Sequence, residues 1–149
     1  MIVLEITDVK GFMGKLLRDG VFDSFELRSV VIESLARFEI HGAKPADEGM
    51  PAEYNSWGSL RKYVYEIIKG ESTPRIMKVV LGLSSEKMQT SFPNSAALFV
   101  NIHFEGGKIT VISGQSPKSF SFEKQDELRW DESLKAFLNK NGITFADNL

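Results

Sequence analysis

Short apolar runs along the chain alternate with longer segments in which apolar residues recur every three or four positions. The run MIVLEI (1–6) predicts a strand, and the next segment predicts a helix that Thr7 or Asp8 caps and that Gly20 ends. A second helix is predicted after a cap at Ser56. The apolar stripes of the two helices are Val9, Phe12, Met13, Leu16 and Leu17 in the first, and Trp57, Leu60, Val64, Ile67 and Ile68 in the second.

Residues 25–41 alternate apolar and polar side chains with the period of two that is typical of strands. A hairpin turn centred on Ser34–Leu35 pairs Val31 with Phe38. Because this turn lacks glycine and asparagine, a bulge or a bend in the hairpin remains an alternative. In the predicted register the core face carries Phe25, Leu27, Val31, Phe38 and Ile40.

A clearer hairpin is predicted in ALFVNIHFEGGKITVIS (97–113). Its Gly106–Gly107 pair suits a two-residue type I′ turn, which needs positive φ at both positions. This turn pairs Glu105 with Lys108. The resulting core face carries Leu98, Val100, Ile102, Phe104, Ile109 and Val111.

The stretch TVISGQSPKSFSF (110–122) has the glycine, hydroxyl and lysine content of a phosphate-binding loop. A turn centred on Ser116–Pro117 instead pairs Ser113 with Phe120 and forms a three-stranded meander. Phosphate loops present N–H groups at a helix N-terminus, whereas this register places a strand next, so the pattern favours a turn. The opposite face of the meander is either solvated or a recognition surface, and it carries Asn101, His103, Thr110, Ile112, Ser119 and Ser121.

The remaining segments complete an α+β domain. IMKVVLGL (76–83) is apolar on both faces and predicts an interior strand, 84–92 predicts one or two helical turns, and 126–140 predicts the last helix. Loop 43–55, with two prolines and a glycine, is of a length that is typical of functional or disordered loops. The predicted order over the single domain 1–149 is β-α-β-β-α-β-(short α)-β-β-β-α, with packed helices on a largely antiparallel sheet.

Composition narrows the classes of function. The 149 residues are 42% hydrophobic and 26% charged, with a net charge of −2, so neither nucleic acid nor an anionic membrane is a favoured partner. The chain has no cysteine, which excludes disulfides, thiolate metal sites and cysteine nucleophiles. No apolar run approaches the ~18 residues of a membrane span, and the N-terminal run is too short for a signal peptide. We therefore expect a soluble, cytoplasmic protein.

Few residues qualify as site candidates. The two histidines, His41 and His103, have no neighbour at metal-ligand spacing, so we assign no metal, no cofactor and no catalytic residue. Segment 11–17 lacks the spacing of a phosphate loop, and the acidic residues of 123–132 suit the start of a helix. The basic and aromatic residues of 56–74 form either a phosphate-binding or a solvated helix face. The candidate binding residues are Asn101, His103, Thr110, Ser119, Arg61 and Lys69.

Several segments carry recognisable short patterns. They are IVLEITDVKGFMGKLL (2–17), FEIHG (38–42), W-x-x-L-R followed by EIIKG-x-x-TP (57–74), NIHFEGG (101–107), SGQS-x-K-x-F (113–120) and WDESLKAFL (130–138). In these patterns, which span nearly the whole chain, the protein resembles a bacterial family of small single-domain proteins that is classed as a domain of unknown function. The resemblance implies one domain that stands alone, and it supplies no activity, cofactor or catalytic residue.

A non-enzymatic cytoplasmic binding or interaction module fits these observations best. A protein or small-molecule partner would meet the polar sheet face or loop 43–55. The first alternative is a small-ligand or regulatory domain, because the order β-α-β-β-α-β permits a ferredoxin-like core. Two further alternatives are a clamp-like protein associated with nucleic acid and an enzyme whose site is assembled from scattered residues.

Overall fold

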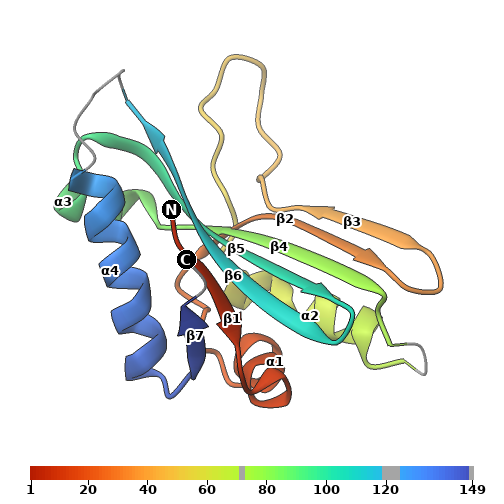
Figure 1. Ribbon diagram of the computed structural model, residues 1–149. Coiled ribbons are helices and arrows are strands. Elements are labelled where there is room, and N and C mark those ends of the chain that lie inside the picture. The colour runs from red at the N-terminus through yellow and green to blue at the C-terminus, as the bar shows by residue number, and fades with distance from the viewer. Residues whose placement is uncertain (71–72, 119–124, 148–149) are drawn as a thin grey trace.

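A computed structural model describes residues 1–70, 73–118 and 125–147 (Figure 1). The described strands form one seven-stranded antiparallel sheet of order β3-β2-β4-β5-β6-β1-β7, so the predicted α+β class with a largely antiparallel sheet is confirmed. The strands are β1 (Val3–Ile6), β2 (Glu26–Glu33), β3 (Arg37–His41), β4 (Ile76–Gly82), β5 (Ser95–Glu105), β6 (Lys108–Pro117) and β7 (Phe145–Asp147). The helices are α1 (Val9–Leu17), α2 (Trp57–Ile68), α3 (Ser85–Ser91) and α4 (Gln125–Lys140).

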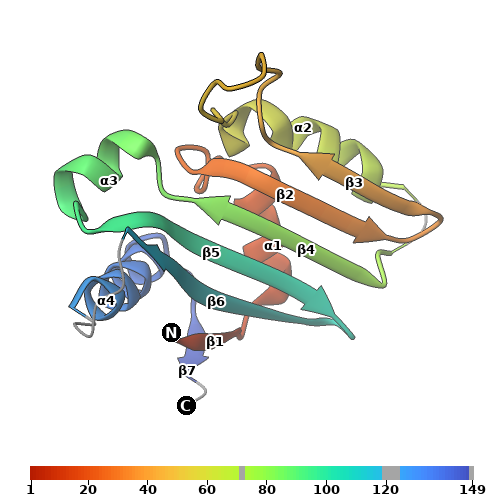
Figure 2. The same cartoon turned by 90° about the horizontal axis from the view of Figure 1, so that it is seen from above.

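The core lies between one face of the sheet and the helices α1, α2 and α4, as Figures 1 and 2 show from two directions. The opposite face, here called the outer face, carries none of these helices. Complete burial of a large apolar side chain contributes about 1.5–3 kcal/mol, so this layer dominates the stability. Among its most buried members are Leu4, Leu27, Ile32, Met77, Leu81, Leu98, Ile102 and Ile109 of the sheet, and Phe12, Leu16, Trp57, Val64, Leu134 and Leu138 of the helices.

The caps of α1 and α2 form as predicted. The Asp8 side chain accepts a hydrogen bond from the Gly11 backbone N–H at 3.0 Å, and the Ser56 hydroxyl accepts one from Ser59 at 3.2 Å. Gly20, just beyond α1, has a φ of 75°. The buried Trp57 indole donates to the backbone carbonyl of Leu16 at 2.8 Å, which joins the start of α2 to the end of α1.

The hairpin of β5 and β6 has the predicted register throughout. Glu105 pairs with Lys108 and Ile102 with Val111. Gly106 and Gly107 have φ values of 61° and 76°, as a type I′ turn requires. The apolar face of this hairpin is buried in the core, with Phe104 partly exposed at its end.

The hairpin of β2 and β3 differs by one residue from the predicted register. Val31 pairs with Glu39 rather than with Phe38, and residues 34–36 connect the two strands. The prediction that Val31 joins the core is therefore wrong, because it lies on the outer face. The core face of this hairpin carries Val30, Ile32, Phe38 and Ile40.

The three-residue connection 34–36 sets this register, and a β-bulge in β2 determines which side chains of the strand face the core. Leu27 pairs with Leu81 of β4, and Ser29 pairs with the adjacent Val80, so Arg28 is an extra residue in the strand. One extra residue reverses the alternation of side chains between the two faces. Leu27 before the bulge and Val30 after it therefore both face the core. Of the alternatives that the sequence left open for the hairpin turn, residues 34–36 form a bend, whereas the bulge lies in the pairing of β2 with β4.

The predicted turn at Ser116–Pro117 is wrong. Both residues belong to β6, and Pro117 pairs with Ser95 of β5. The place beside Ser113 that the meander assigned to Phe120 is taken by Ile2, the residue before β1, whose backbone N–H donates to the Ser113 hydroxyl. The strand predicted over 119–122 lies outside the described residues, and the next described element is the helix α4.

The sheet also contains a strand that the sequence analysis did not predict. Phe145–Asp147 forms β7 after α4 and pairs with β1 at the sheet edge. β1 therefore lies between β6 and β7, away from β2, β3 and β4. In a ferredoxin-like core the first strand pairs with the third and fourth strands of the β-α-β-β-α-β unit, whereas β1 pairs with β6 and β7, so this topology contradicts the ferredoxin-like arrangement.

Candidate functional site

Three of the predicted binding residues lie together on the outer face. His103 pairs with Thr110 across β5 and β6, and Asn101 precedes His103 on the same side of β5. The Asn101 side-chain amide donates to the Ile112 carbonyl at 3.2 Å. His103 Nε2 lies 3.4 Å from a Glu105 carboxylate oxygen, outside hydrogen-bonding geometry, and is buried without a hydrogen-bond partner in the part of the chain that the structure describes.

The other predicted residues are not part of this group. Arg61 and Lys69 belong to the α2 region, on the core side of the sheet (Figures 1 and 2). Arg61 donates to both carboxylate oxygens of Asp23, at 2.8 and 3.2 Å, and to the Leu17 carbonyl at the end of α1. Lys69 forms an exposed ion pair with a neighbouring glutamate on α2. Ser119 lies outside the described residues, so the structure does not bring the six candidates together as one site.

Arg28, the bulge residue of β2, occupies an unusual environment beside the outer face. The centre of its guanidinium lies 3.8 Å from the centre of the Tyr54 ring and 5.5 Å from that of Phe99. A Cβ atom added at Gly82 would lie only 2.8 Å from Arg28 Nε. The guanidinium thus packs against the Tyr54 ring, which loop 43–55 provides, and lies close to β4 at Gly82.

The hydrogen-bonding capacity of Arg28 is largely unused. Nη2 lies 3.4 Å from a Glu26 carboxylate oxygen, and the other oxygen of Glu26 accepts from the Ser85 backbone N–H at 3.4 Å. Arg28 Nε is buried and has no hydrogen-bond partner among the described residues. Because buried donors in folded proteins are nearly always paired, this nitrogen is a donor that a bound group could pair.

Two hollows meet at Arg28, and together they are called the Arg28 cleft here. The smaller has a volume of about 160 Å³ and the larger about 570 Å³. Arg28, Ser85 and Ala96 line both of them. The smaller hollow is otherwise lined by Leu83, Met88, Gln89, Phe92, Ser95 and Lys118, and the larger by Glu26, Lys44, Ala52, Glu53 and Tyr54.

Loop 43–55 forms one wall of the cleft because its two ends pair with each other. Ala43 and Tyr54 form an isolated bridge, and the Lys44 backbone N–H donates to the Glu53 carbonyl at 2.7 Å. At the base of the loop the Gly42 backbone packs closely against that of Leu27, because an added Cβ atom on Gly42 would lie 1.7 Å from the Leu27 carbonyl oxygen. The loop is therefore ordered at its base, and this pairing positions Tyr54 over Arg28.

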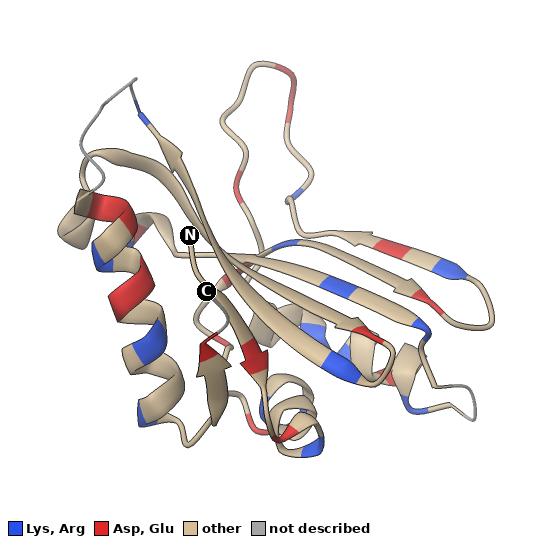
Figure 3. Cartoon of the chain, in the orientation of Figure 1, with Lys and Arg blue, Asp and Glu red and all other residues tan. Residues whose placement is uncertain are grey.

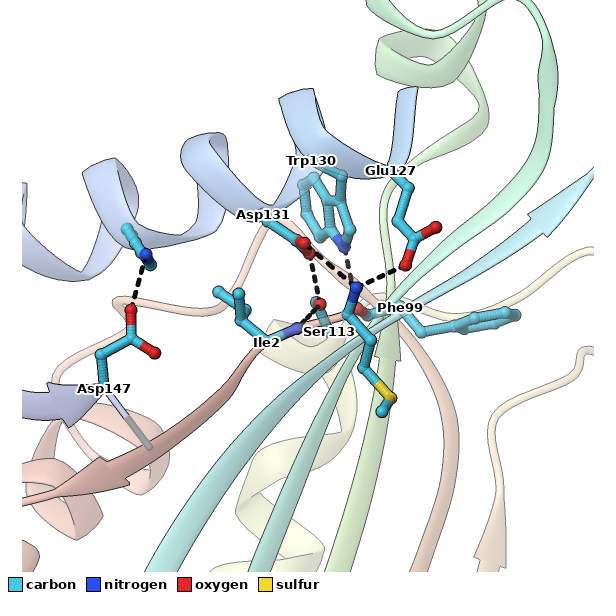
Figure 4. Close-up of polar contacts among 9 residues, drawn as sticks. Ile2, Phe99, Ser113, Glu127, Trp130, Asp131 and Asp147 are labelled. Carbon is cyan, nitrogen blue, oxygen red and sulfur yellow. Dashed lines mark hydrogen bonds and ion pairs between the residues drawn. The ribbon is translucent and has the colours of Figure 1, made fainter. Parts of the chain in front are cut away.

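A second polar cluster fastens α4 to the sheet (Figure 4). The buried Ser113 hydroxyl donates to the buried carboxylate of Asp131 and accepts from Ile2. The Met1 ammonium lies 3.1 Å from the second carboxylate oxygen of Asp131 and also contacts Glu127. The hydrogen bond with Glu127, followed by the contacts with Asp131, raises the pKa of the Met1 ammonium. Both Asp131 oxygens are thus engaged, so we assign this cluster a structural role.

Charges of both signs are interspersed along the strands near the outer face, as Figure 3 shows. Glu33 lies between two arginines, 2.8 Å from Arg37 and 3.1 Å from Arg75, and Arg37 also contacts Glu39 at 3.0 Å. The two arginines lower the pKa of the Glu33 carboxyl. The positive charges of the two arginines are therefore balanced by the neighbouring glutamates.

The described residues were also compared with the requirements of a metal site and of a membrane-spanning helix. Within the described ranges, no group of three or more His, Asp or Glu side chains is arranged to hold a metal ion. None of the helices in those ranges is both long and apolar enough to cross a membrane.

Arg28 could not be identified from the sequence as a site residue. Alternation along the predicted strand assigns it, together with Glu26, to a charged solvated face. Its environment depends on the bulge and on contacts with Tyr54 and Phe99, which are distant in sequence. The turn without glycine or asparagine did not indicate the bulge, because that turn joins β2 to β3 and the bulge lies in the pairing of β2 with β4.

Comparison with known proteins gives one match. No curated protein and no solved structure matches the chain. Residues 15–146, in contrast, match the model of a protein family that is described as a family of unknown function, DUF5721. The match covers most of the chain and agrees with the resemblance seen in its short sequence patterns. The chain therefore belongs to the family of unknown function DUF5721.

Proposed function

We propose that this protein is a non-enzymatic cytoplasmic binding module and that its small-molecule ligand occupies the Arg28 cleft. The observation that carries the proposal is Arg28, whose side chain lines two open hollows and whose buried Nε has no hydrogen-bond partner among the described residues. A ligand that supplies an acceptor would remove the cost of this unpaired donor, which is about 1–3 kcal/mol.

The side chains of the cleft support binding over catalysis. Neither hollow has a histidine in its lining, and among the described residues Ser85 and Ser95 are its hydroxyl side chains besides Tyr54. Glu26 is engaged by Arg28 and by the Ser85 backbone N–H. A serine nucleophile requires an adjacent general base, and the carboxylate that Ser95 contacts, Asp126, is also engaged by Arg129. Ser95 accepts from Gln115 and donates to Asp126.

The outer-face residues Asn101, His103 and Thr110 are proposed as a flanking surface. Phe99 contacts Arg28 and lies on the same strand and the same side as Asn101. A ligand that extends from the cleft along β5 would therefore meet Asn101 first. The interspersed charges near this face do not favour nucleic acid, whose phosphates require a concentrated basic surface.

The test is a thermal-shift screen with a library of small metabolites. Ala96, which is exposed and lines both hollows, is replaced by tryptophan to fill the cleft. The matched control is Ala36→Trp, an exposed alanine in the connection between β2 and β3. We expect at least one metabolite to raise the melting temperature of the wild type and of A36W but not of A96W. A ligand that stabilises all three proteins equally would place binding elsewhere and contradict the proposal.

A further inference from the structure

We infer that the ligand of the Arg28 cleft is recognised through an oxyanion, a carboxylate or a phosphate, which binds in the smaller hollow against Arg28 and Lys118. The inference rests on the proposed binding function and specifies the chemistry of its ligand.

The lining of the smaller hollow favours a negative group. Among the residues that the structure describes, it contains two cations, Arg28 and Lys118, and the polar side chains of Ser85 and Gln89, but no carboxylate. The Lys118 ammonium makes no ion pair within the described part of the chain. Asp126 lies behind this wall, where it holds Ser95 and faces Arg129, so its charge is already partnered. An oxyanion bound in the hollow would balance the positive charge of its two cations.

Arg28 is held in place for such a contact before the ligand arrives. Tyr54 covers one side of its guanidinium and the Gly82 backbone approaches it closely, while the side chain remains 24% exposed. Its contact with Glu26 is long, at 3.4 Å, and uses only Nη2. Arginine binds carboxylates and phosphates most strongly through two parallel hydrogen bonds, and a fixed guanidinium loses little entropy when it makes them.

The volumes of the two hollows indicate the size of the ligand. A volume of about 160 Å³ accommodates a single carboxylate or phosphate group, whereas the adjoining volume of about 570 Å³ is typical of sites for small organic molecules. Lys44, Glu53 and Tyr54 give the larger hollow a polar lining. The ligand class is therefore a small polar molecule with one oxyanion at its end.

Gly82 permits a test that leaves every charge in place. An added Cβ atom would lie 2.8 Å from Arg28 Nε and 3.3 Å from Nη2, and it would meet side-chain atoms at the flexible end of Arg28. Gly82→Ala therefore displaces the guanidinium at small cost to the fold. The variant therefore tests whether binding depends on where the Arg28 guanidinium lies, because its positive charge is still present.

The experiment is a two-dimensional NMR titration with inorganic phosphate in one arm and acetate in the other, each against sodium chloride at equal ionic strength. We expect saturable shifts of the amides around 26–28, 82–85 and 95–97 in at least one arm, and that arm identifies the group. Arg28→Gln, Lys118→Gln and Gly82→Ala should each weaken this binding about tenfold or more. The control Lys62→Gln removes an exposed cation on α2, on the other side of the sheet, and should leave it unchanged.

Three results would overturn the inference. They are the absence of saturable shifts in both arms, equal weakening by K62Q, and unchanged binding in R28Q and G82A when both variants give the wild-type pattern of dispersed amide signals. The metabolite screen distinguishes this failure from failure of the proposed function. If a ligand from the screen fails to bind A96W but still binds R28Q, the proposed binding function stands and the inference that the ligand is recognised through an oxyanion is wrong.

Discussion

The hydroxyl of Ser113 on β6 and the carboxylate of Asp131 on α4 form a hydrogen bond in the interior, where both residues are nearly inaccessible to solvent. The same hydroxyl accepts from the Ile2 backbone N–H, and the same carboxylate faces the Met1 ammonium. One pair of side chains thus connects the first residues of the chain, a central strand and the last helix.

We expect replacement of either partner to destabilise the fold. Ser113→Ala leaves the Ile2 N–H and one Asp131 oxygen unpaired, and should lower the free energy of unfolding by about 1–3 kcal/mol. Asp131→Ala should cost a similar amount, and the double variant less than the sum of the two. Urea denaturation measures all three. Glu132→Ala, at the exposed next position, is the control and should stay within about 0.5 kcal/mol of the wild type.

The contacts of the Met1 ammonium predict a dependence of stability on alkaline pH. Glu127 and Asp131 raise its pKa above the ordinary value of 8.0, so the folded state holds this proton more tightly than the unfolded state. The stabilisation is complete below pH 8.0 and disappears as the pH rises through the higher pKa of the folded state. Comparison of the wild type with Glu127→Gln by urea denaturation should show a stability difference that shrinks above pH 8.0. A difference that stays constant to pH 10.5, roughly the ordinary lysine pKa, would contradict this assignment.

Gly42 should tolerate no side chain. A Cβ atom at this position meets the backbone oxygen of Leu27 at 1.7 Å, and neither backbone can move without breaking the pairing at the base of loop 43–55. We expect Gly42→Ala to lower the free energy of unfolding by about 1–3 kcal/mol, as overpacked sites do. Gly70→Ala is the matched control, because an added Cβ there meets no atom within 4 Å. That variant should be neutral or slightly more stable, since alanine restricts the unfolded chain.

Arg61 should contribute to stability rather than to anion binding. Its bidentate contact with Asp23 and its hydrogen bond to the Leu17 carbonyl join α2 to the end of α1. We expect Arg61→Ala to cost about 1–2 kcal/mol in denaturation experiments, because the pair is partly buried and also satisfies a backbone group. Lys62→Ala should cost far less. Equal binding of phosphate by R61A and wild type would agree with this role, whereas a selective loss of phosphate binding in R61A would restore the predicted phosphate-binding face of α2.

Local patterns in the sequence predicted the elements whose geometry is set locally. The Gly106–Gly107 pair determines its own turn, so the register from Glu105 and Lys108 onward followed from strand alternation alone. The caps at Asp8 and Ser56 are likewise short-range interactions. In each case the residues that determine the structure are neighbours in the chain.

The elements that were missed depend on distant contacts. Ser116 and Pro117 resemble a turn, yet pairing with β5 keeps them in β6. The three residues of β7 have little strand pattern of their own and pair only because β1 offers an edge. The Arg28 cleft combines a bulge, a loop residue and a glycine from three segments. The periodicity of apolar residues within one segment does not predict that these three segments come into contact.

The position of β1 has a consequence for how the chain folds as it is synthesised. β2, β3, β4, β5 and β6 pair mostly with strands that are close to them in the chain. β1 is different, because the Ile2 backbone meets Ser113 across a sequence separation of 111 residues. The apolar N-terminal strand therefore leaves the ribosome long before its partner exists, and its insertion between β6 and β7 must be among the last folding events.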